Sequence, residues 1–303
     1  MADAFVYGEI GPDNLIRVPW LPDAERAAPV LSDTYHPGGA ASNVAVLLAH
    51  WGISVRLSGN ALGDDFAGEI MLGFLKLHPE IDLSTLMVAA GASTPFCRIL
   101  IPPNGDRVVL FYHAHQAPTV SLTPEMLQGC KLCILDDNGG AERVLAASAA
   151  KQLSIPVVCG DVYRLDHPLL PYADVIVNSA HLIRSKLPGI DVETHASSLH
   201  AAASATIITS YGAEPVRIID QGGQSFSVAP PAGVVVVDAT GAGDALKAGI
   251  CLGLLSDRSL QDAVRLGVSA GALVVQQVGA CTNPPALEEL TKLANELEIQ
   301  LNG

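Results

Sequence analysis

Basic residues are scarce in this sequence, and their scarcity restricts its partners. The chain has 17 Lys and Arg against 31 Asp and Glu, a formal net charge of −14. Because a nucleic-acid backbone is bound by clustered cations, we expect no nucleic-acid partner. A nucleotide ligand remains compatible, since backbone N–H groups hold phosphate without lysine, and the 28 glycines suit that route.

Long hydrophobic runs are also missing. No stretch approaches the roughly 18 uninterrupted apolar residues of a membrane span, although 49% of the residues are hydrophobic and the mean hydropathy is +0.35. The segment from Met1 to Gly8 carries an acid where a signal peptide would carry Lys or Arg. We therefore expect a cytoplasmic protein with a large core and no membrane partner.

Metal-binding patterns are weak. Cys130-Lys-Leu-Cys133 has the spacing of a metal or redox pair, but it leads directly into an apolar strand and has no second pair nearby. No His-Glu-x-x-His pattern occurs. We expect the six cysteines to be reduced thiols in the core and no zinc site.

Strand and helix patterns alternate along most of the chain. This alternation predicts an α/β fold in which a mostly parallel central sheet has helices on both faces. No repeat or linker divides the chain, so we expect one domain over residues 1–303. The expected strands are 4–8, 53–58, 131–136, 155–159, 174–178 and 205–210, and the main expected helices are 40–51, 140–152, 193–204 and 259–277.

Two segments do not fit the alternation. Residues 14–36 contain two short strand patterns around a Pro-rich turn, and residues 93–115 contain a hairpin with its turn at 102–106. We expect them to form a small β lid over the carboxyl end of the sheet, where it would exclude water from a reacting group.

The most informative stretch is Asp238-Ala-Thr-Gly-Ala-Gly-Asp244. The β-branched run 233–238 predicts a buried strand before it, and 245–255 continues as a helix. A turn of small residues at a helix start leaves N–H groups free to bind an anion. Asp244 would then be a base beside an anion cradle, or only a helix cap. The residues of the cradle are Gly241, Ala242 and Gly243.

Four further positions follow predicted strands or lie at the start of a predicted helix. Asp13 lies beyond the first strand, where it would bind substrate hydroxyls or cap a loop. Asn43 lies in the first turn of the helix that follows Gly38 and Gly39. Its side chain would face a ligand there, or it would only be part of an ordinary capped helix. Ser210 and Gly212 end the strand near 205–210.

Together these motifs resemble the ribokinase/PfkB family of carbohydrate and nucleoside kinases across nearly the whole chain. The resemblance implies a ribokinase-like three-layer sandwich with a β lid, and transfer of phosphate from ATP, with Mg²⁺, to a hydroxymethyl group. It implies that Asp244 is the base and that the amides from Gly241 to Asp244 form the anion hole. It also implies a sugar site at Asp13, Gly39 and Asn43, and nucleotide contacts at Asn178, Ser210, Gly212, Gly241 and Gly243.

The resemblance also concerns cations and assembly. It allows K⁺ near Asp238 and Thr240, and it implies a homodimer through the lid. His181 departs from the family, which often carries Glu at this position to organise Mg²⁺.

Three functions therefore stay open. A sugar kinase, with a lean toward fructokinase-like members, is the leading hypothesis. A nucleoside kinase would need an aromatic residue to stack a base, and Phe96, Phe111 and Tyr112 of the lid are candidates. A weakly active sensor of sugar or nucleotide is the third, because His181 replaces an acid.

Overall fold

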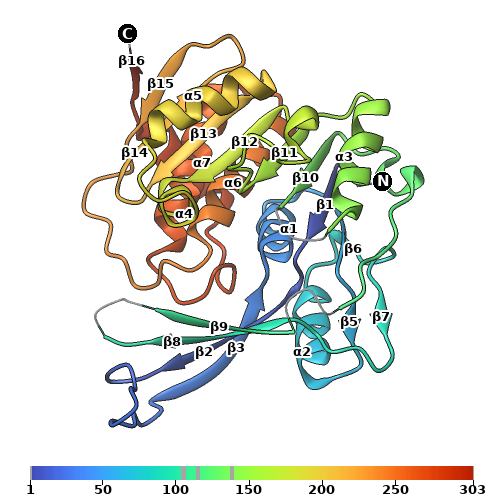
Figure 1. Cartoon of the computed structure of the whole chain (residues 1–303), viewed down its shortest axis with the longest axis vertical. Coiled ribbons are helices and arrows are strands. Elements are labelled where there is room, and N and C mark those ends of the chain that lie inside the picture. Colours follow the sequence, from blue (N-terminus) through green and yellow to red (C-terminus); the bar gives the residue numbers. More distant parts are fainter. Residues whose placement is uncertain (1, 104–106, 114–116, 137–139, 303) are drawn as a thin grey trace.

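The computed structural model describes residues 2–103, 107–113, 117–136 and 140–302 (Figure 1). Parts of the expected hairpin turn and lid, residues 104–106, 114 and 115, lie outside this range. Within the described residues no helix has both the length and the apolar character that crossing a membrane requires.

A ten-stranded sheet forms the centre of the molecule. Its strands run parallel from β13 to β6, and β14, β15 and β16 extend it in antiparallel fashion, so the expected mostly parallel sheet is confirmed. In spatial order the strands are β16 (Ile299–Asn302), β15 (Ser225–Val228), β14 (Glu214–Ile219), β13 (Thr206–Tyr211), β12 (Val175–Ser179), β11 (Val157–Gly160), β10 (Leu132–Leu135), β1 (Ala4–Gly8), β4 (Val55–Gly59) and β6 (Ile81–Asp82).

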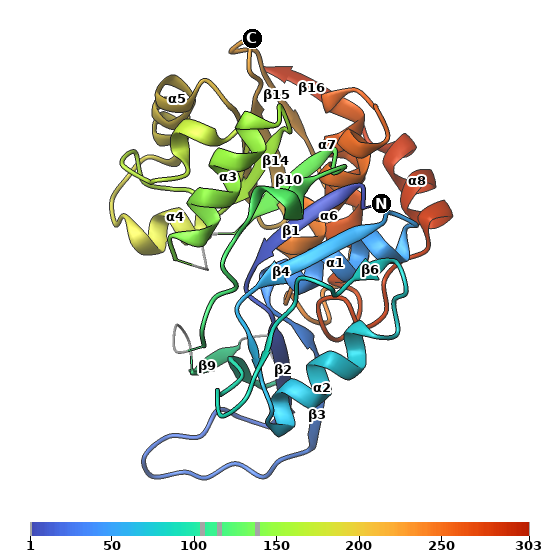
Figure 2. The same cartoon turned by 90° about the vertical axis from the view of Figure 1, so that its right-hand side faces the viewer.

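Helices cover both faces of the sheet, which gives three layers (Figures 1 and 2). Side chains alternate along β1: Val6 packs into the core on one face, whereas Phe5 and Tyr7 pack into the core on the other. The first core includes α1 (Ala40–His50), α6 (Ala242–Leu255), α7 (Leu260–Val274) and α8 (Leu287–Glu296). The second includes α3 (Glu142–Gln152) and α5 (Val192–Ala203), and α4 (Ala180–Lys186) packs beside α5.

A separate four-stranded sheet forms the lid, as expected. Its order is β3 (Ser32–Gly38), β2 (Gly11–Arg17), β8 (Phe96–Ile101) and β9 (Val108–Tyr112). It projects from the lower end of the molecule in Figure 1, next to α2 (Phe66–Leu75) and the short pair β5 (Leu62–Gly63) and β7 (Val88–Ala89). Asp65 caps α2 by accepting a hydrogen bond from the Gly68 N–H group at 2.8 Å.

The prediction of a buried strand over 233–238 is wrong. The segment forms no strand, and Val235 and Val236 are 70% and 61% exposed. β15, the strand that precedes this run, is already paired on both sides, with β14 and β16. The last N–H groups of the run, of Val237 and Asp238, donate instead to the Val275 carbonyl group at the end of α7.

The six cysteines are free thiols, and all but Cys97 are buried. Cys130 and Cys133 belong to the core on the α3 side of the sheet. Burial raises the pKa of the Cys133 thiol well above its usual range, so it stays protonated. The prediction of core thiols is therefore confirmed for five of the six cysteines, and Cys97 is half-buried in the lid sheet.

Candidate active site

The glycine turn of the Asp238–Asp244 motif begins α6. Gly241 is the N-terminal cap of the helix and has a left-handed backbone, with φ 74°. A β-carbon at this position would lie 2.2 Å from that of Ala280, so only glycine fits between the turn and the loop that follows α7.

The first turn of α6 presents bare peptide groups. In the described part of the chain no side chain accepts a hydrogen bond from the N–H group of Gly243 or Asp244. A β-carbon at Gly243 would meet no other atom within 4 Å, so open space adjoins this turn. Free N–H groups at the positive end of a helix next to open space are suited to hold an anion.

The Asp244 carboxylate is held by a side chain from another helix. Asn43 Nδ2, on α1, donates a hydrogen bond to Asp244 Oδ2 at 2.8 Å. Asn43 is buried, and its Oδ1 lies 3.2 Å from the Sγ of Cys281, which donates to it. The amide is therefore fixed at both ends, and it fixes the carboxylate beside the bare helix start.

Asp13 lies on β2, 7% exposed, under the turn between β3 and α1. A β-carbon at Gly38 would lie 2.4 Å from the Asp13 carboxyl carbon, so glycine makes room for the acid. Burial raises the pKa of Asp13 to about 7, and the nearby charges of Glu9 and Asp244 act in the same direction. The two carboxylates predicted to serve one site are thus close enough to interact.

Gly39 brings the start of α1 against the end of β1. It has φ 82°, and a β-carbon there would lie 2.5 Å from the Glu9 carbonyl oxygen. The Ala41 N–H group donates to that carbonyl at 3.1 Å. Asp13, from one motif, and Gly39 and Asn43, from another, therefore surround the same turn.

Asp238 ties the loop before α6 to the loop after α7. Its Oδ1 accepts from the Thr240 N–H group and its Oδ2 from the Gly279 N–H group, both at 2.9 Å. The lid reaches the same loop, because Arg107 Nη1 donates to Thr240 Oγ1 at 3.1 Å. Both carboxylate oxygens are thus already used in the loop, and the main observed role of Asp238 is to shape it.

The residues expected to contact nucleotide lie at the ends of β12 and β13. Asn178 Nδ2 donates to the Val162 carbonyl group at 2.8 Å, but its buried Oδ1 has no hydrogen-bond partner among the described residues. Ser210 lies beside it, with Oγ 3.4 Å from the Asn178 carbonyl oxygen. Gly212 is an exposed turn residue with φ 69°. His181 is exposed in the first turn of α4.

The residues of the candidate site suit a hydrated Mg²⁺ ion bound to the phosphates of a nucleotide better than a metal ion held by protein ligands. The described residues contain no group of three or more His, Cys, Asp or Glu side chains placed to hold a metal ion. The unused Asn178 Oδ1 is an acceptor that suits a metal-bound water or a ligand donor. Mg²⁺ commonly keeps several waters in sites that bind it through phosphates.

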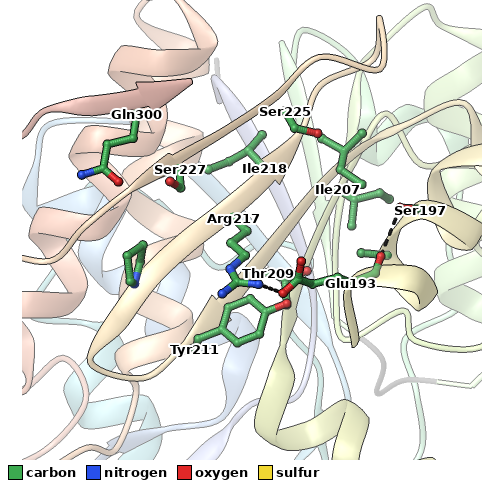
Figure 3. Close-up of a pocket in the computed structure, with 13 residues that line it drawn as sticks. Glu193, Ser197, Ile207, Thr209, Tyr211, Arg217, Ile218, Ser225, Ser227 and Gln300 are labelled. Carbon is green, nitrogen blue, oxygen red and sulfur yellow. Dashed lines mark hydrogen bonds and ion pairs between the residues drawn. The ribbon is translucent and has the colours of Figure 1, made fainter. Parts of the chain in front are cut away.

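A pocket of about 610 Å³ lies elsewhere, between α5 and strands β13 to β16 (Figure 3). Arg217 and Glu193 form an ion pair across it, and Thr209 and Tyr211 also line it. None of its lining residues is among those predicted to bind sugar or phosphate. The candidate site is therefore the turn around Asp13 and Asp244.

Two residues near Asp244 were not predicted. Cys281 positions Asn43, and Lys247 Nζ lies 3.7 Å from Asp244 Oδ1. The i, i+3 spacing of Asp244 and Lys247 was a usable signal for the second, because such residues share a helix face. No local signal links Cys281 to Asn43, since 238 residues separate them.

Comparisons with known proteins bear on the family and the fold of the chain. A model of the pfkB family carbohydrate kinases matches residues 1–287. The ribokinase of Lactococcus lactis is 27% identical, over 99% of this chain and all of that protein. Among solved structures, Arabidopsis thaliana ribokinase complexed with ribose and ATP has a TM-score of 0.82 at 18% identity, covering 97% of this chain and 99% of that one. A Burkholderia thailandensis nucleoside kinase in complex with inosine has a TM-score of 0.75 at 20% identity, covering 96% of each chain. These two structures establish the fold.

The raised pKa of Asp13 predicts an effect on stability. The free energy of unfolding should fall as the pH rises from about 4 to about 7, because the unfolded chain releases this proton before the folded chain does. Asp13→Asn removes the effect, so the variant should gain over the wild type by up to a few kcal/mol at pH 8 and by less at pH 5. Urea unfolding without ligand at the two pH values measures this difference.

Asp23→Asn is the matched control, since Asp23 is an exposed acid in the lid. Its effect should be the same at both pH values. A gain from Asp13→Asn that does not grow with pH would contradict the burial argument.

Proposed function

The chain belongs to the pfkB family of carbohydrate kinases, and we propose that it transfers the γ-phosphoryl group of ATP to a hydroxymethyl group of a small sugar. The observation that carries the proposal is the bond between Asn43 and Asp244 beside the bare start of α6. It unites an oriented carboxylate with an anion cradle, which are the two parts that an alcohol phosphotransferase needs.

In the proposed mechanism Asp244 accepts the proton of the attacking hydroxyl group. Asn43 keeps the carboxylate in place, while Asp13 and Gly39 hold other hydroxyl groups of the sugar. The amides from Gly241 to Asp244 donate to the phosphoryl oxygens as negative charge develops on them. The lid excludes water, which would otherwise compete with the sugar hydroxyl for the phosphoryl group.

The proposed nucleotide site runs from this cradle to the ends of β12 and β13. Asn178, Ser210 and Gly212 would contact ATP, and the unused Asn178 Oδ1 would accept from a water of the Mg²⁺ shell. When bound, Mg²⁺ would neutralise part of the negative charge of the ATP phosphates. Both oxygens of the Asp238 carboxylate already accept hydrogen bonds from backbone N–H groups. A K⁺ ion near Asp238 and Thr240 would therefore bind backbone carbonyl groups and not this carboxylate.

A nucleoside is the second candidate acceptor. Phe96 and Tyr112 stack in the lid with ring centroids 4.5 Å apart, and Cys97, next to Phe96, pairs with Asp13 across β8 and β2. A base could therefore meet an aromatic surface close to the proposed hydroxyl site. ATP consumption with a panel of sugars and nucleosides decides between the two, and tight binding without any turnover would favour a sensor.

Asp244→Ala should lower kcat by at least about 100-fold with the best acceptor, because the base is lost. ATP binding should persist, since the amides do not depend on the side chain. Steady-state kinetics and calorimetry with ATP measure the two effects. Glu289→Ala, which removes an exposed acid of α8, should leave both unchanged. A variant Asp244→Ala with near-normal kcat would refute the assignment.

Gly243→Ala should separate activity from stability. The new methyl group meets no atom of the protein, so stability should stay the same or rise by about 0.5–1 kcal/mol, as helical Gly→Ala changes do. The same methyl group would crowd a phosphoryl group at the cradle, so kcat/KM should fall at least about tenfold, or roughly 1.4 kcal/mol. Full activity would mean that no anion approaches Gly243.

We further propose that two copies of the chain associate through their lids. Leu110 and Phe111 of β9 are 44% and 66% exposed, and such apolar residues suit a protein interface. Sedimentation velocity should detect a dimer that Phe111→Ser weakens. A monomer at micromolar concentration would count against the dimer and leave the kinase proposal intact.

A further inference from the structure

Lys247 is a buried lysine on α6, one turn after Asp244 in the chain. It is only 4% exposed, which is rare for lysine unless its charge is paired. Removing an ammonium group from water costs several kcal/mol, so a fold keeps one in this place only where carboxylates compensate for it. If the pair with Asp244 served only to stabilise the helix, the same i, i+3 spacing on the helix surface would serve without burial of the lysine. The position of Lys247 therefore calls for an explanation beyond helix stability.

The surroundings of Lys247 are acidic on several elements. Its Nζ lies 3.7 Å from Asp244 Oδ1, and the charges of Asp136, after β10, and Asp161, after β11, also act on it. Burial alone would lower the pKa of Lys247, but these carboxylates outweigh it and raise the pKa above its usual value. Cys251, one turn further along α6, also faces the amine. The ammonium group therefore remains charged.

The sheet makes room for this side chain. A β-carbon at Gly160, the last residue of β11, would lie 2.8 Å from Lys247 Nζ. The ion pair with Asp244 is longer than a hydrogen bond, and no hydrogen bond within the described chain reaches this Nζ. The ammonium group thus lies at the carboxyl edge of the sheet, and its N–H groups remain available as hydrogen-bond donors.

We propose that Lys247 is a positioning residue for phosphoryl transfer. Its ammonium group holds the Asp244 carboxylate from the side opposite Asn43, and it supplies fixed positive charge beneath an acidic cleft. This inference rests on the proposed kinase function. Without the cation, the Asp244 carboxylate would face the phosphates of ATP with no ammonium group beside it. With it, the carboxylate has one partner on each side.

Lys247→Met removes the charge and keeps most of the volume. We expect kcat to fall at least about tenfold, equivalent to roughly 1.4 kcal/mol, and the KM for ATP to rise, because the cleft becomes more negative. Sugar binding without ATP should change less than twofold, since Asp13, Gly39 and Asn43 are untouched. Lys247→Arg, which keeps the charge, should recover part of the loss.

Cys251→Ala is the matched control. It removes a buried side chain from the same face of α6 and alters no positive charge. It should lower stability and leave kcat and the KM for ATP close to wild type. Loss of activity in proportion to lost stability in both Cys251→Ala and Lys247→Met would overturn the proposal, as would wild-type kinetics in Lys247→Met.

Gly160→Ala provides a test that does not depend on the folding of Lys247→Met. The three atoms nearest to the added methyl group all belong to the flexible side chain of Lys247, with Nζ the closest, so the chain should fold. A several-fold loss of kcat is expected with the charge still present, and unchanged kcat would overturn the proposal. If Asp244→Ala loses activity as expected while the Lys247 and Gly160 variants stay fully active, the role proposed for Lys247 is rejected and the kinase proposal stands. Full activity in Asp244→Ala would reject the kinase mechanism itself.

Discussion

The hydrogen bond between Asn43 and Asp244 is the contact on which the site depends. It joins α1 to α6 across 201 residues of sequence, and both helices belong to the core on the same face of the sheet. The bond places a carboxylate at the start of a helix where the N–H groups of Gly243 and Asp244 have no acceptor within the described residues. A hydroxyl group that gives its proton to this carboxylate would lie next to the place where the N–H groups hold negative charge. Position and electrostatics therefore arise from one packing arrangement.

Close approach of backbone segments is the second requirement. Gly241 leaves space for Ala280, Gly38 for the Asp13 carboxylate, and Gly160 for the Lys247 amine. Each glycine lets a functional group or turn come nearer than a β-carbon would permit. The glycines therefore determine the shape of the cleft, although they carry no chemistry. Burial of Asp13 raises its pKa to about 7, so the same compactness costs stability near neutral pH.

Local patterns predicted much of this arrangement. The lid hairpin, the helix after Gly39, the alternating strands and the start of α6 all follow from turn residues and periodicity within short windows. The strand over 233–238 was wrong because a β-branched run in the sequence does not show whether it has a strand to pair with. This run follows β15, which β14 and β16 already pair on both sides. Cys281 was missed because its partner Asn43 is set by tertiary packing. The i, i+3 spacing signalled Asp244 as a partner of Lys247, but nothing in the helix sequence signalled Asp136 and Asp161, which the folded sheet brings to the lysine.

The central claim is that sugar and phosphate meet at the Asp244 carboxylate and the first turn of α6. A crystal structure of the chain with its best acceptor and a non-hydrolysable ATP analogue tests it most directly. The account predicts an acceptor hydroxyl within about 2.6–3.2 Å of an Asp244 oxygen and γ-phosphate oxygens about 2.7–3.1 Å from the amides between Gly241 and Asp244. An acceptor bound away from Asp244, for example in the pocket beside Arg217, would contradict it.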